Sequence, residues 1–346
     1  MDTSLLHKVE ITDIIVETAT TKTFVLKPLH GWNPEYQPGQ FLTLLFYNTG
    51  VEKRRSFSLV SHPGKESLLR ITVKRVPNGE YSRFLLDRTS VGDEFYTTGT
   101  AGFFTLPEQQ DERIKRLFFL AAGSGITPVF SLISYALEKW PAVTIVLIYS
   151  NRNEEETIFR QSIMTLQKVY NQRFAVEWLQ SNSSNVLKAR LSNYLLNIIL
   201  KRYDAHHADL FYMCGPFDYM LMIQITLLSY GVPGANIYKE QFSTLPRMVK
   251  PVPPDTARHN ATIHVAGRTF NFSVQYPSTI LAVAKANDIL LPYSCEAGRC
   301  GSCAAKCVSG QVWMAYNEVL TDDEVANGRI LVCQSYPVGG DVIIEF

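Results

Sequence analysis

Four cysteines near the C-terminal end have a spacing that suits electron-transfer chemistry. Cys295, Cys300 and Cys303 stand in the run C-E-A-G-R-C-G-S-C, and Cys333 follows at a distance in V-C-Q-S. The pattern C-x4-C-x2-C with a remote fourth cysteine is typical of the thiolates that hold a [2Fe–2S] cluster, where each iron takes two sulfur ligands. The sequence therefore predicts these four cysteines as iron ligands.

Two other chemistries remain open for the same cysteines. A zinc site usually takes two separate C-x2–4-C pairs, and only one half of that pattern is present. A disulfide framework is unusual in a chain of this length without a secretory segment. Cys307 lies outside the pattern, and we expect it to be a packed strand residue.

Two glycine turns follow strand-like apolar runs and could bind a nucleotide. The first is G-S-G-I-T-P at 123–128, and the second is C-G-P at 214–216. The end of a parallel strand, followed by a helix N-terminus, offers free N–H groups and a helix dipole to a phosphate. The first turn departs from G-x-G-x-x-G, so a plain structural turn is its alternative, and Cys214 alone could be a small buried hydrophobe. Two such turns at one sheet edge would form one crevice.

The first hundred residues contain two further candidate anion sites. Arg54 and Arg55 stand in the strand-like run R-R-S-F-S, where one guanidinium could hold a phosphate; solvated edge charges are the alternative. Gly79 begins G-E-Y-S, which could start a helix whose first N–H groups take a pyrophosphate.

The residues after V-T-I-V-L-I-Y bear on the choice of nicotinamide cofactor. Ser150 and Arg152 suit a 2′-phosphate, whereas an acidic residue there would bind a ribose 2′-OH. The nearby Glu154, Glu155 and Glu156 weaken this argument. The sequence favours NADPH, with NADH as the alternative.

Hydrophobic periodicity predicts the elements that position these residues. Residues 1–108 show short apolar runs of period two, typical of an antiparallel barrel or sandwich. Residues from about 110 to 243 alternate strand-like and helix-like runs, which indicates βαβ units and a parallel sheet. A proline-rich tether follows, and from about 258 a hairpin, a short helix, the cysteine loop and a final strand complete the chain.

Composition sets broad limits on the protein class. The 346 residues are 46% hydrophobic and 19% charged, with a formal net charge of +1, so the sequence gives no global attraction to nucleic acid or anionic membrane. The uncharged stretch 117–137 is long enough to span a bilayer, but its glycine turn and Pro128 favour a buried strand, a turn and a helix. No signal peptide is recognisable, so we expect a cytoplasmic protein without membrane insertion.

These motifs make the chain resemble the ferredoxin–NADP reductase superfamily over essentially its whole length. R-S-F-S at 55–58 is similar to the family's R-x-Y-S flavin motif, with Phe57 where Tyr is usual. By that resemblance Arg55 binds a flavin phosphate and Ser58 lies beside the reactive ring. P-G-Q-F at 38–41 resembles the family's P-G-Q turn.

The resemblance extends to the other motifs. The glycine turn at 123–128 and C-G-P at 214–216 are similar to the family's nicotinamide-nucleotide elements, and Glu240 and Phe242 resemble residues that close over the flavin. The implied catalytic residues are Ser58, Thr127, Cys214 and Glu240. The cofactor-binding residues expected from the motifs and the resemblance together are Arg55, Ser56, Phe57, Ser58, Ile71, Val73, Gly79, Tyr81, Ser82, Gly123, Gly125, Thr127, Ser150, Arg152, Gly215, Pro216 and Phe242.

The resemblance implies a multidomain architecture. An antiparallel β-barrel FAD domain covers 1–108, an α/β parallel-sheet NAD(P) domain 109–243, a linker 244–257 and a β-grasp (α+β) [2Fe–2S] ferredoxin domain 258–346. This order resembles the reductase subunits of phenylacetyl-CoA epoxidase and related oxygenases. FMN-using relatives typically read G-G-I-G-I-T-P, so the A-G-S-G-I-T-P of this chain favours FAD.

The implied function is electron transfer from NAD(P)H through FAD and the cluster to a separate protein acceptor, an oxygenase component. FAD takes a hydride and releases single electrons, which makes it suited to feed a one-electron cluster. Two alternatives remain: direct reduction of small acceptors such as ferric chelates, quinones or oxygen, and a redox-sensing iron–sulfur flavoprotein.

Overall fold

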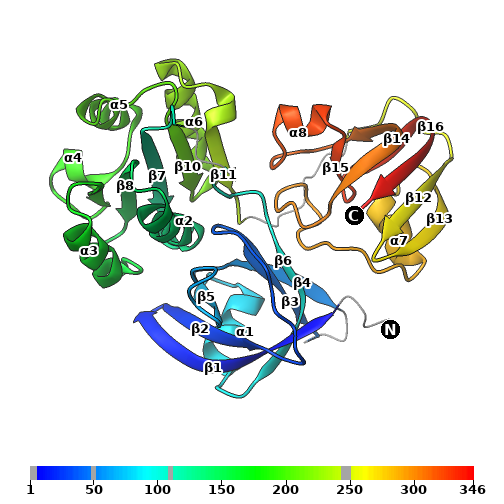
Figure 1. Cartoon of the computed structure of the whole chain (residues 1–346), viewed down its shortest axis with the longest axis horizontal. Coiled ribbons are helices and arrows are strands. Elements are labelled where there is room, and N and C mark those ends of the chain that lie inside the picture. Colours follow the sequence, from blue (N-terminus) through cyan, green and yellow to red (C-terminus); the bar gives the residue numbers. More distant parts are fainter. Residues whose placement is uncertain (1–5, 48–51, 108–111, 243–250) are drawn as a thin grey trace.

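The computed structural model describes residues 6–47, 52–107, 112–242 and 251–346. These residues form three sheets, each in its own lobe (Figure 1). The expected domain boundaries at 108–109 and 243–244 lie outside the described residues. The three sheets fall within the three expected domains, because none draws strands from more than one of them.

The first sheet is antiparallel and has the strand order β4-β3-β6-β1-β2-β5. A bridge between Leu59 and Ile71 links the ends of this order, so the sheet closes into the expected barrel. Alternate side chains such as Leu42 and Leu44 fill its core, as the period-two pattern predicts. Its elements are β1 (His7–Thr18), β2 (Thr21–Pro28), β3 (Phe41–Phe46), β4 (Lys53–Ser58), β5 (Leu69–Lys74), α1 (Glu80–Arg88) and β6 (Glu94–Ala101).

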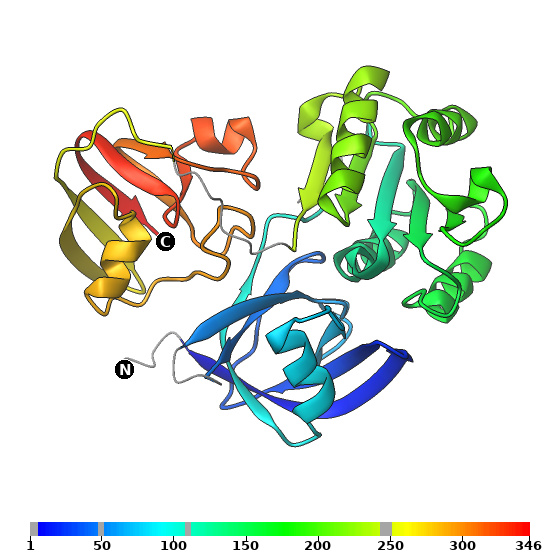
Figure 2. The ribbon, with the colours of Figure 1, turned by 180° about the vertical axis from the view of Figure 1, so that it is seen from behind.

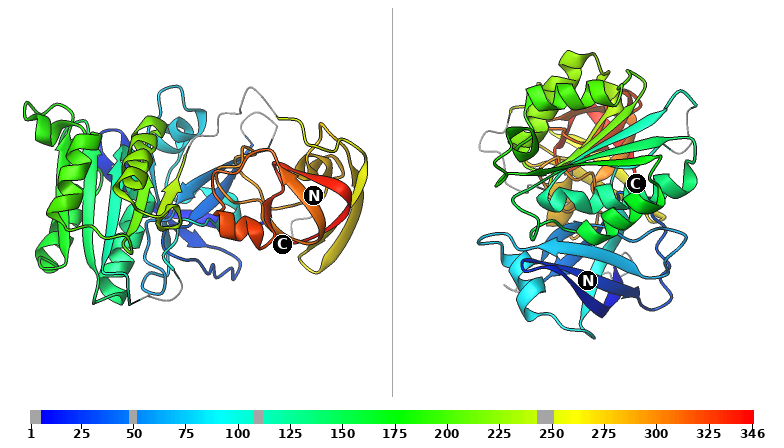
Figure 3. Two further views of the ribbon diagram at one scale, coloured as in Figure 1. Left: turned by 90° about the horizontal axis from the view of Figure 1, so that it is seen from above. Right: turned by 90° about the vertical axis from the view of Figure 1, so that its left-hand side faces the viewer.

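The second sheet is parallel and has the order β11-β10-β7-β8-β9. Leu117 and Phe119 pack with helices α2 and α3 on one face, while Phe118 and Leu120 pack with α5 and α6 on the other, so helices cover both faces (Figure 3). Its elements are β7 (Arg116–Ala122), η1 (Gly123–Gly125), α2 (Ile126–Lys139), β8 (Thr144–Asn151), α3 (Arg160–Val169), β9 (Phe174–Gln180), α4 (Val186–Ala189), α5 (Asn193–Arg202), β10 (Leu210–Cys214), α6 (Phe217–Tyr230), η2 (Gly234–Asn236) and β11 (Ile237–Glu240).

The uncharged stretch 117–137 is divided between β7, η1 and α2, which confirms the strand–turn–helix prediction. Among the described residues, every helix is too short or too polar to cross a membrane.

The third sheet has the order β13-β12-β16-β14-β15, with β12 parallel to β16. Helix α7 packs its buried Ile280 and Leu281 into the core of this sheet, which gives the expected β-grasp arrangement. Asp255, near the end of the tether, accepts bonds from the Gly339 N–H and His259 Nε2 and anchors the tether to this sheet. The elements are β12 (His259–Val265), β13 (Arg268–Val274), α7 (Ile280–Ala286), β14 (Ala304–Met314), α8 (Asp322–Ala326), β15 (Arg329–Leu331) and β16 (Ser335–Glu345).

Candidate functional site

Strand β4 divides its side chains between two environments. Alternation along a strand places Arg55 and Phe57 on one face and Arg54, Ser56 and Ser58 on the other. The Arg55 guanidinium lies 4.4 Å from the ring centroid of Tyr81 in α1. Ser56 and Ser58 instead contact residues of the other two lobes, so this strand is where the three lobes meet.

The start of α1 has the features of an anion site. Gly79 is the N-cap residue and supplies no side-chain cap, so the first N–H groups of this nine-residue helix remain available. A Cβ on Gly79 would lie 2.7 Å from Ser82 Oγ and 2.9 Å from Val76 Cβ, so a larger residue would crowd the start of the helix. With Arg55 nearby, two groups that favour anions border the same space, as a flavin diphosphate requires.

The two strand-end turns of the parallel sheet are in direct contact. A Cβ on Gly125 would lie 2.0 Å from the carbonyl oxygen of Cys214, so only glycine permits this approach. Thr127 Oγ1 donates to Ser124 O at 3.0 Å and fixes the start of α2. The structure therefore brings 123–128 and 214–216 to one sheet edge, as expected.

Glu240 ends β11 beside the buried Cys214 in the sheet register and accepts a hydrogen bond from Ser58 Oγ at 3.1 Å. One side of its carboxyl faces a cavity, so the residue is only partly buried. Protein nevertheless surrounds the carboxyl closely, and this loss of solvation raises the pKa of Glu240 to about 8 against the smaller opposing effect of the Ser58 bond. An acid that is neutral near pH 7 is thus placed where the resemblance puts the reactive flavin ring.

The four predicted iron ligands form two pairs. Cys295 interacts with Cys300, and Cys303 with Cys333. The neighbouring Cys300 side chain and backbone N–H groups of the loop, including that of Ala297, stabilise the thiolate of Cys295 and lower the pKa of this thiol. Two thiols for each of two irons is the arrangement that a [2Fe–2S] cluster needs.

No three His, Cys, Asp or Glu side chains gather as one metal ion would require, within the part of the chain that the structure describes. The two separate cysteine pairs provide one pair of thiolates for each iron of a two-iron cluster. Gly298 and Gly301 have φ values of 73° and 71°, so they provide the turns of the loop that carries the first three cysteines. Cys307 lies in β14, where it packs partly buried against the core of the third sheet.

A cavity of about 550 Å³ connects these elements. Figures 1 and 2 show the cysteine loop turned toward the barrel at the junction of the lobes. The expected site residues that line the cavity are Arg55, Ser56, Phe57, Ser58, Val73, Gly79, Tyr81, Ser82, Thr127, Glu240, Phe242, Cys295 and Cys300. Residues of the flavin motif, the first nucleotide turn and two predicted iron ligands thus line the same cavity.

Other expected residues lie away from this cavity. Ile71 is fully buried in the core of the barrel, because its position in β5 points inward. Cys303 and Cys333 are buried behind Cys295 and Cys300. Gly123, Gly125, Ser150, Arg152, Cys214, Gly215 and Pro216 lie at or near the strand ends of the parallel sheet, outside the cavity lining.

Several residues at the site were not predicted from the sequence. Lys74 lines the cavity and also approaches Glu156, with 3.5 Å between Nζ and Oε2. Ser294 lines it beside Cys295, and its position next to a predicted ligand was an available signal. Lys74 had no comparable signal in the sequence, because its partner Glu156 belongs to another lobe and no local pattern predicts that contact.

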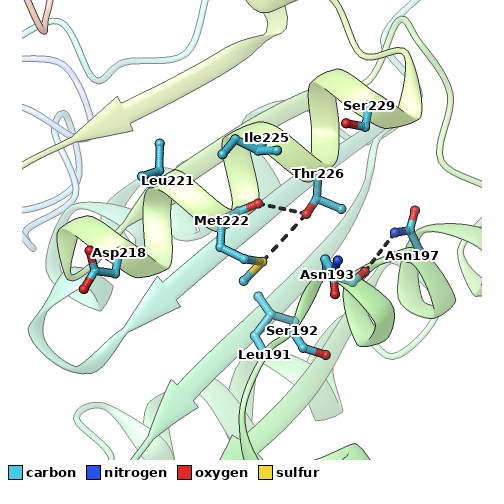
Figure 4. A pocket seen from close by; sticks show the side chains of 10 residues that line it. All are labelled: Leu191, Ser192, Asn193, Asn197, Asp218, Leu221, Met222, Ile225, Thr226 and Ser229. Carbon is cyan, nitrogen blue, oxygen red and sulfur yellow. Dashed lines mark hydrogen bonds between the residues drawn. The ribbon is translucent and has the colours of Figure 1, made fainter.

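A second cavity, of about 640 Å³, lies between α5 and α6 (Figure 4). Leu221, Met222 and Ile225 contribute apolar surface, and Asp218 lies at one end. None of the residues predicted to bind a cofactor or a metal lines it. This groove is therefore separate from the candidate site.

Family models match all three parts of the chain. Residues 8–106 match the oxidoreductase FAD-binding domain, 119–225 the oxidoreductase NAD-binding domain and 263–338 the 2Fe-2S iron-sulfur cluster binding domain. These matches show that FAD, a nicotinamide dinucleotide and a [2Fe–2S] cluster are the cofactors.

Similar proteins cover nearly the whole chain. The ferredoxin reductase component of 3-ketosteroid-9-alpha-monooxygenase from Rhodococcus rhodochrous is 32% identical over 97% of this chain and 95% of its own. One of the subunits of 1,2-phenylacetyl-CoA epoxidase from Escherichia coli is 30% identical over 98% and 97%. Phthalate dioxygenase reductase has the same fold, with a TM-score of 0.62 and 23% identity over 99% of this chain and 98% of that one. The three family models and the relatives that are at least 30% identical over nearly the whole chain lead to one conclusion: the chain belongs to the family of ferredoxin-reductase-type oxidoreductases that join FAD-binding, NAD-binding and [2Fe–2S] domains.

Proposed function

We propose that this protein takes electrons from NAD(P)H, passes them through FAD and the [2Fe–2S] cluster, and delivers them to a separate oxygenase component. The single observation that supports this proposal most strongly is the shared cavity. Flavin-motif residues such as Arg55 line it together with Thr127 of the nucleotide turn and Cys295 and Cys300 of the cluster loop. Such an arrangement suits three redox groups that exchange electrons in sequence.

The chain's own residues have distinct tasks in this proposal. FAD, when bound, supplies the exchange between a hydride and single electrons. Arg55 and the N-terminus of α1 hold its diphosphate, and Tyr81 packs against the Arg55 guanidinium. Ser58 hydrogen-bonds Glu240, whose raised pKa keeps a proton at the carboxyl below about pH 8. Thr127 and the contact between Gly125 and Cys214 shape the part of the site where the nicotinamide is proposed to bind.

An oxygenase component is the proposed acceptor because of the relatives' roles. The Rhodococcus and Escherichia coli relatives are named as parts of a monooxygenase and an epoxidase, and both match almost the full chain. The reductase subunit of glycine betaine monooxygenase from Pseudomonas aeruginosa is also similar, at 26% identity over 98% of this chain. The cytoplasmic location and the lack of a nucleic-acid partner stay predictions from the sequence.

Separate acceptors test the route through the cluster. Ferricyanide can accept electrons directly from the flavin. In the proposed route, cytochrome c, a protein acceptor, takes its electrons from the cluster. We expect Cys303→Ser to retain NADPH-driven ferricyanide reduction and to lose most cytochrome c reduction. Equal cytochrome c rates in the variant and the wild type would contradict transfer through the cluster.

We further propose that NADPH is preferred over NADH. Arg152 is 76% exposed at the end of β8 and lies 3.6 Å from Glu156, so its charge is accessible but partly offset. Lys74 shares the same carboxylate and offers a second positive charge nearby. Arg152→Gln is expected to lower kcat/KM for NADPH by about tenfold and to change the value for NADH little, since a 2′-phosphate alone needs the guanidinium. A wild-type preference for NADH would overturn this proposal.

A further inference from the structure

Arg54 is a buried arginine that the flavin motif does not include. Only 2% of its side chain is exposed. Its Nη1 donates to the carbonyl oxygens of Leu291 at 3.2 Å and Tyr293 at 3.5 Å, and its Nε donates to Glu52 Oε1 at 2.7 Å. A buried guanidinium must be hydrogen-bonded and charge-paired. Arg54 takes its charge partner, Glu52, from its own lobe and two further hydrogen-bond acceptors from the ferredoxin lobe.

The Tyr293 side chain completes the contact. The Arg54 guanidinium carbon lies 3.8 Å from the Tyr293 ring centroid, and the Tyr293 hydroxyl donates to Glu52 at 3.5 Å. Lys285 lies 4.4 Å from the same ring centroid. A planar guanidinium can stack on a ring while its Nη1 donates to carbonyls and its Nε to a carboxylate, whereas the compact ammonium of a lysine offers no such plane.

The loop that Arg54 contacts leads directly into the cluster site. Leu291 and Tyr293 flank Pro292, and Ser294 precedes the first predicted iron ligand, Cys295. Ser56, two residues after Arg54 on the same face of β4, donates to Ser294 Oγ at 2.8 Å. The loop is therefore held at two successive points of the strand that carries the flavin motif.

The two neighbouring arginines have separate tasks. Arg55 lines the cavity and contacts Tyr81. Arg54 lies on the opposite face of β4 and donates a hydrogen bond to Leu291 in the loop that precedes Cys295. Since Cys295 and Cys300 line the same cavity as Arg55, a shift of the loop would change the distance between the flavin site and the cluster ligands.

We propose that Arg54 is a positioning residue that fixes the cluster loop against the flavin strand and thereby sets the rate of electron transfer from flavin to cluster. This inference rests on the proposed function. It predicts that loss of Arg54 leaves flavin reduction by NADPH intact and slows only the following step. Small displacements of reacting groups have large effects on rates, so we expect a slowing of about tenfold or more.

Anaerobic stopped-flow absorbance of the holoenzyme separates the two steps, and Arg54→Met is the test variant. Its matched control is Arg75→Met, which removes an arginine of the same barrel that pairs with Asp87 at the surface. Arg54→Lys is expected to recover only part of the rate. Hydrogen exchange of residues 291–296 supplies a readout independent of activity, with faster exchange in Arg54→Met and wild-type exchange in Arg75→Met.

The outcomes distinguish this inference from the proposed function. A wild-type cluster that NADPH does not reduce would overturn both. A folded Arg54→Met with wild-type cluster reduction and wild-type loop exchange would overturn the role of Arg54 alone. Flavin reduction slowed as much as cluster reduction would also overturn it, because that result would assign Arg54 to flavin binding. If Arg54→Met does not fold, Tyr293→Leu removes the stacked ring and must show the same selective slowing; an unchanged rate would overturn the inference.

Discussion

Ser56 and Ser294 hydrogen-bond each other through their hydroxyl oxygens at 2.8 Å, although 237 residues lie between them in the chain. Ser56 belongs to the strand that carries the flavin motif, and Ser294 immediately precedes Cys295. Ser58 on the same strand bonds Glu240 of the parallel-sheet lobe. One short strand, β4, therefore contacts both of the other lobes at the place where electrons are proposed to pass.

The ligand assignment predicts different results for two neighbouring cysteines. Cys303→Ser is expected to lose the [2Fe–2S] cluster and keep FAD, because one iron would lose a thiolate. Cys307→Ser is expected to keep both, since Cys307 lies in β14 outside the two cysteine pairs. Iron content and the visible spectrum of each purified variant measure this. Loss of the cluster in Cys307→Ser with retention in Cys303→Ser would show that the ligand set is wrong.

Arg55→Met is expected to weaken FAD binding. A hydrogen bond to a charged group contributes about 1.5–3 kcal/mol, so the dissociation constant should rise by about ten- to a hundredfold. Flavin fluorescence released on dilution measures the effect. Arg83→Met, at an exposed position of α1, is the control and should bind FAD as the wild type does. Full FAD retention in Arg55→Met would contradict the assigned role.

Glu240 should make stability depend on pH in a defined direction. Its pKa is raised in the folded protein to about 8, above the ordinary carboxyl value of 4.5, so the folded state holds more protons between these two values. Its contribution is therefore complete below about pH 4.5 and is lost as pH rises through about 8. Urea unfolding of wild type and Glu240→Gln at several pH values measures this difference. The variant should lose less stability between about pH 5 and pH 9, and identical pH dependence would contradict the raised pKa.

Gly125→Ala is expected to destabilise the parallel-sheet domain. The added Cβ would lie 2.0 Å from the Cys214 carbonyl oxygen, so the two turns would have to move apart. Overpacking of this kind costs about 1–3 kcal/mol of the free energy of unfolding. Gly234→Ala is the control, since a Cβ there meets no atom within 4 Å, and its effect should stay within about 0.5 kcal/mol. Equal stability of the two variants would contradict the close contact of the turns.

Local patterns were enough to predict most of the fold. In β7, Leu117, Phe119 and Phe118 are all apolar because both faces of a parallel sheet are covered, and the sequence run shows this directly. Helix α5 lies in the region predicted to alternate strands and helices, and its buried Leu195, Leu196, Ile199 and Leu200 have helical spacing. This spacing is a signal that the sequence itself contains.

The site was predictable where its residues belong to a recognisable motif. The cysteine loop and the glycine turns carry recognisable spacing constraints. Arg54 carries none, because its partners Leu291 and Tyr293 belong to another domain, and no local pattern encodes which loops meet. For the same reason the sequence left open whether paired arginines were surface charges, whereas the structure buries Arg54 and places Arg55 at the cavity.

The most direct test of the proposed electron route is the visible spectrum of the anaerobic holoenzyme during titration with NADPH. The proposal predicts that the flavin bands and the broad iron–sulfur absorbance both bleach, with the reduced cluster then detectable by electron paramagnetic resonance. Bleaching of the flavin alone, with an oxidised cluster at excess NADPH, would contradict transfer from the flavin to the cluster.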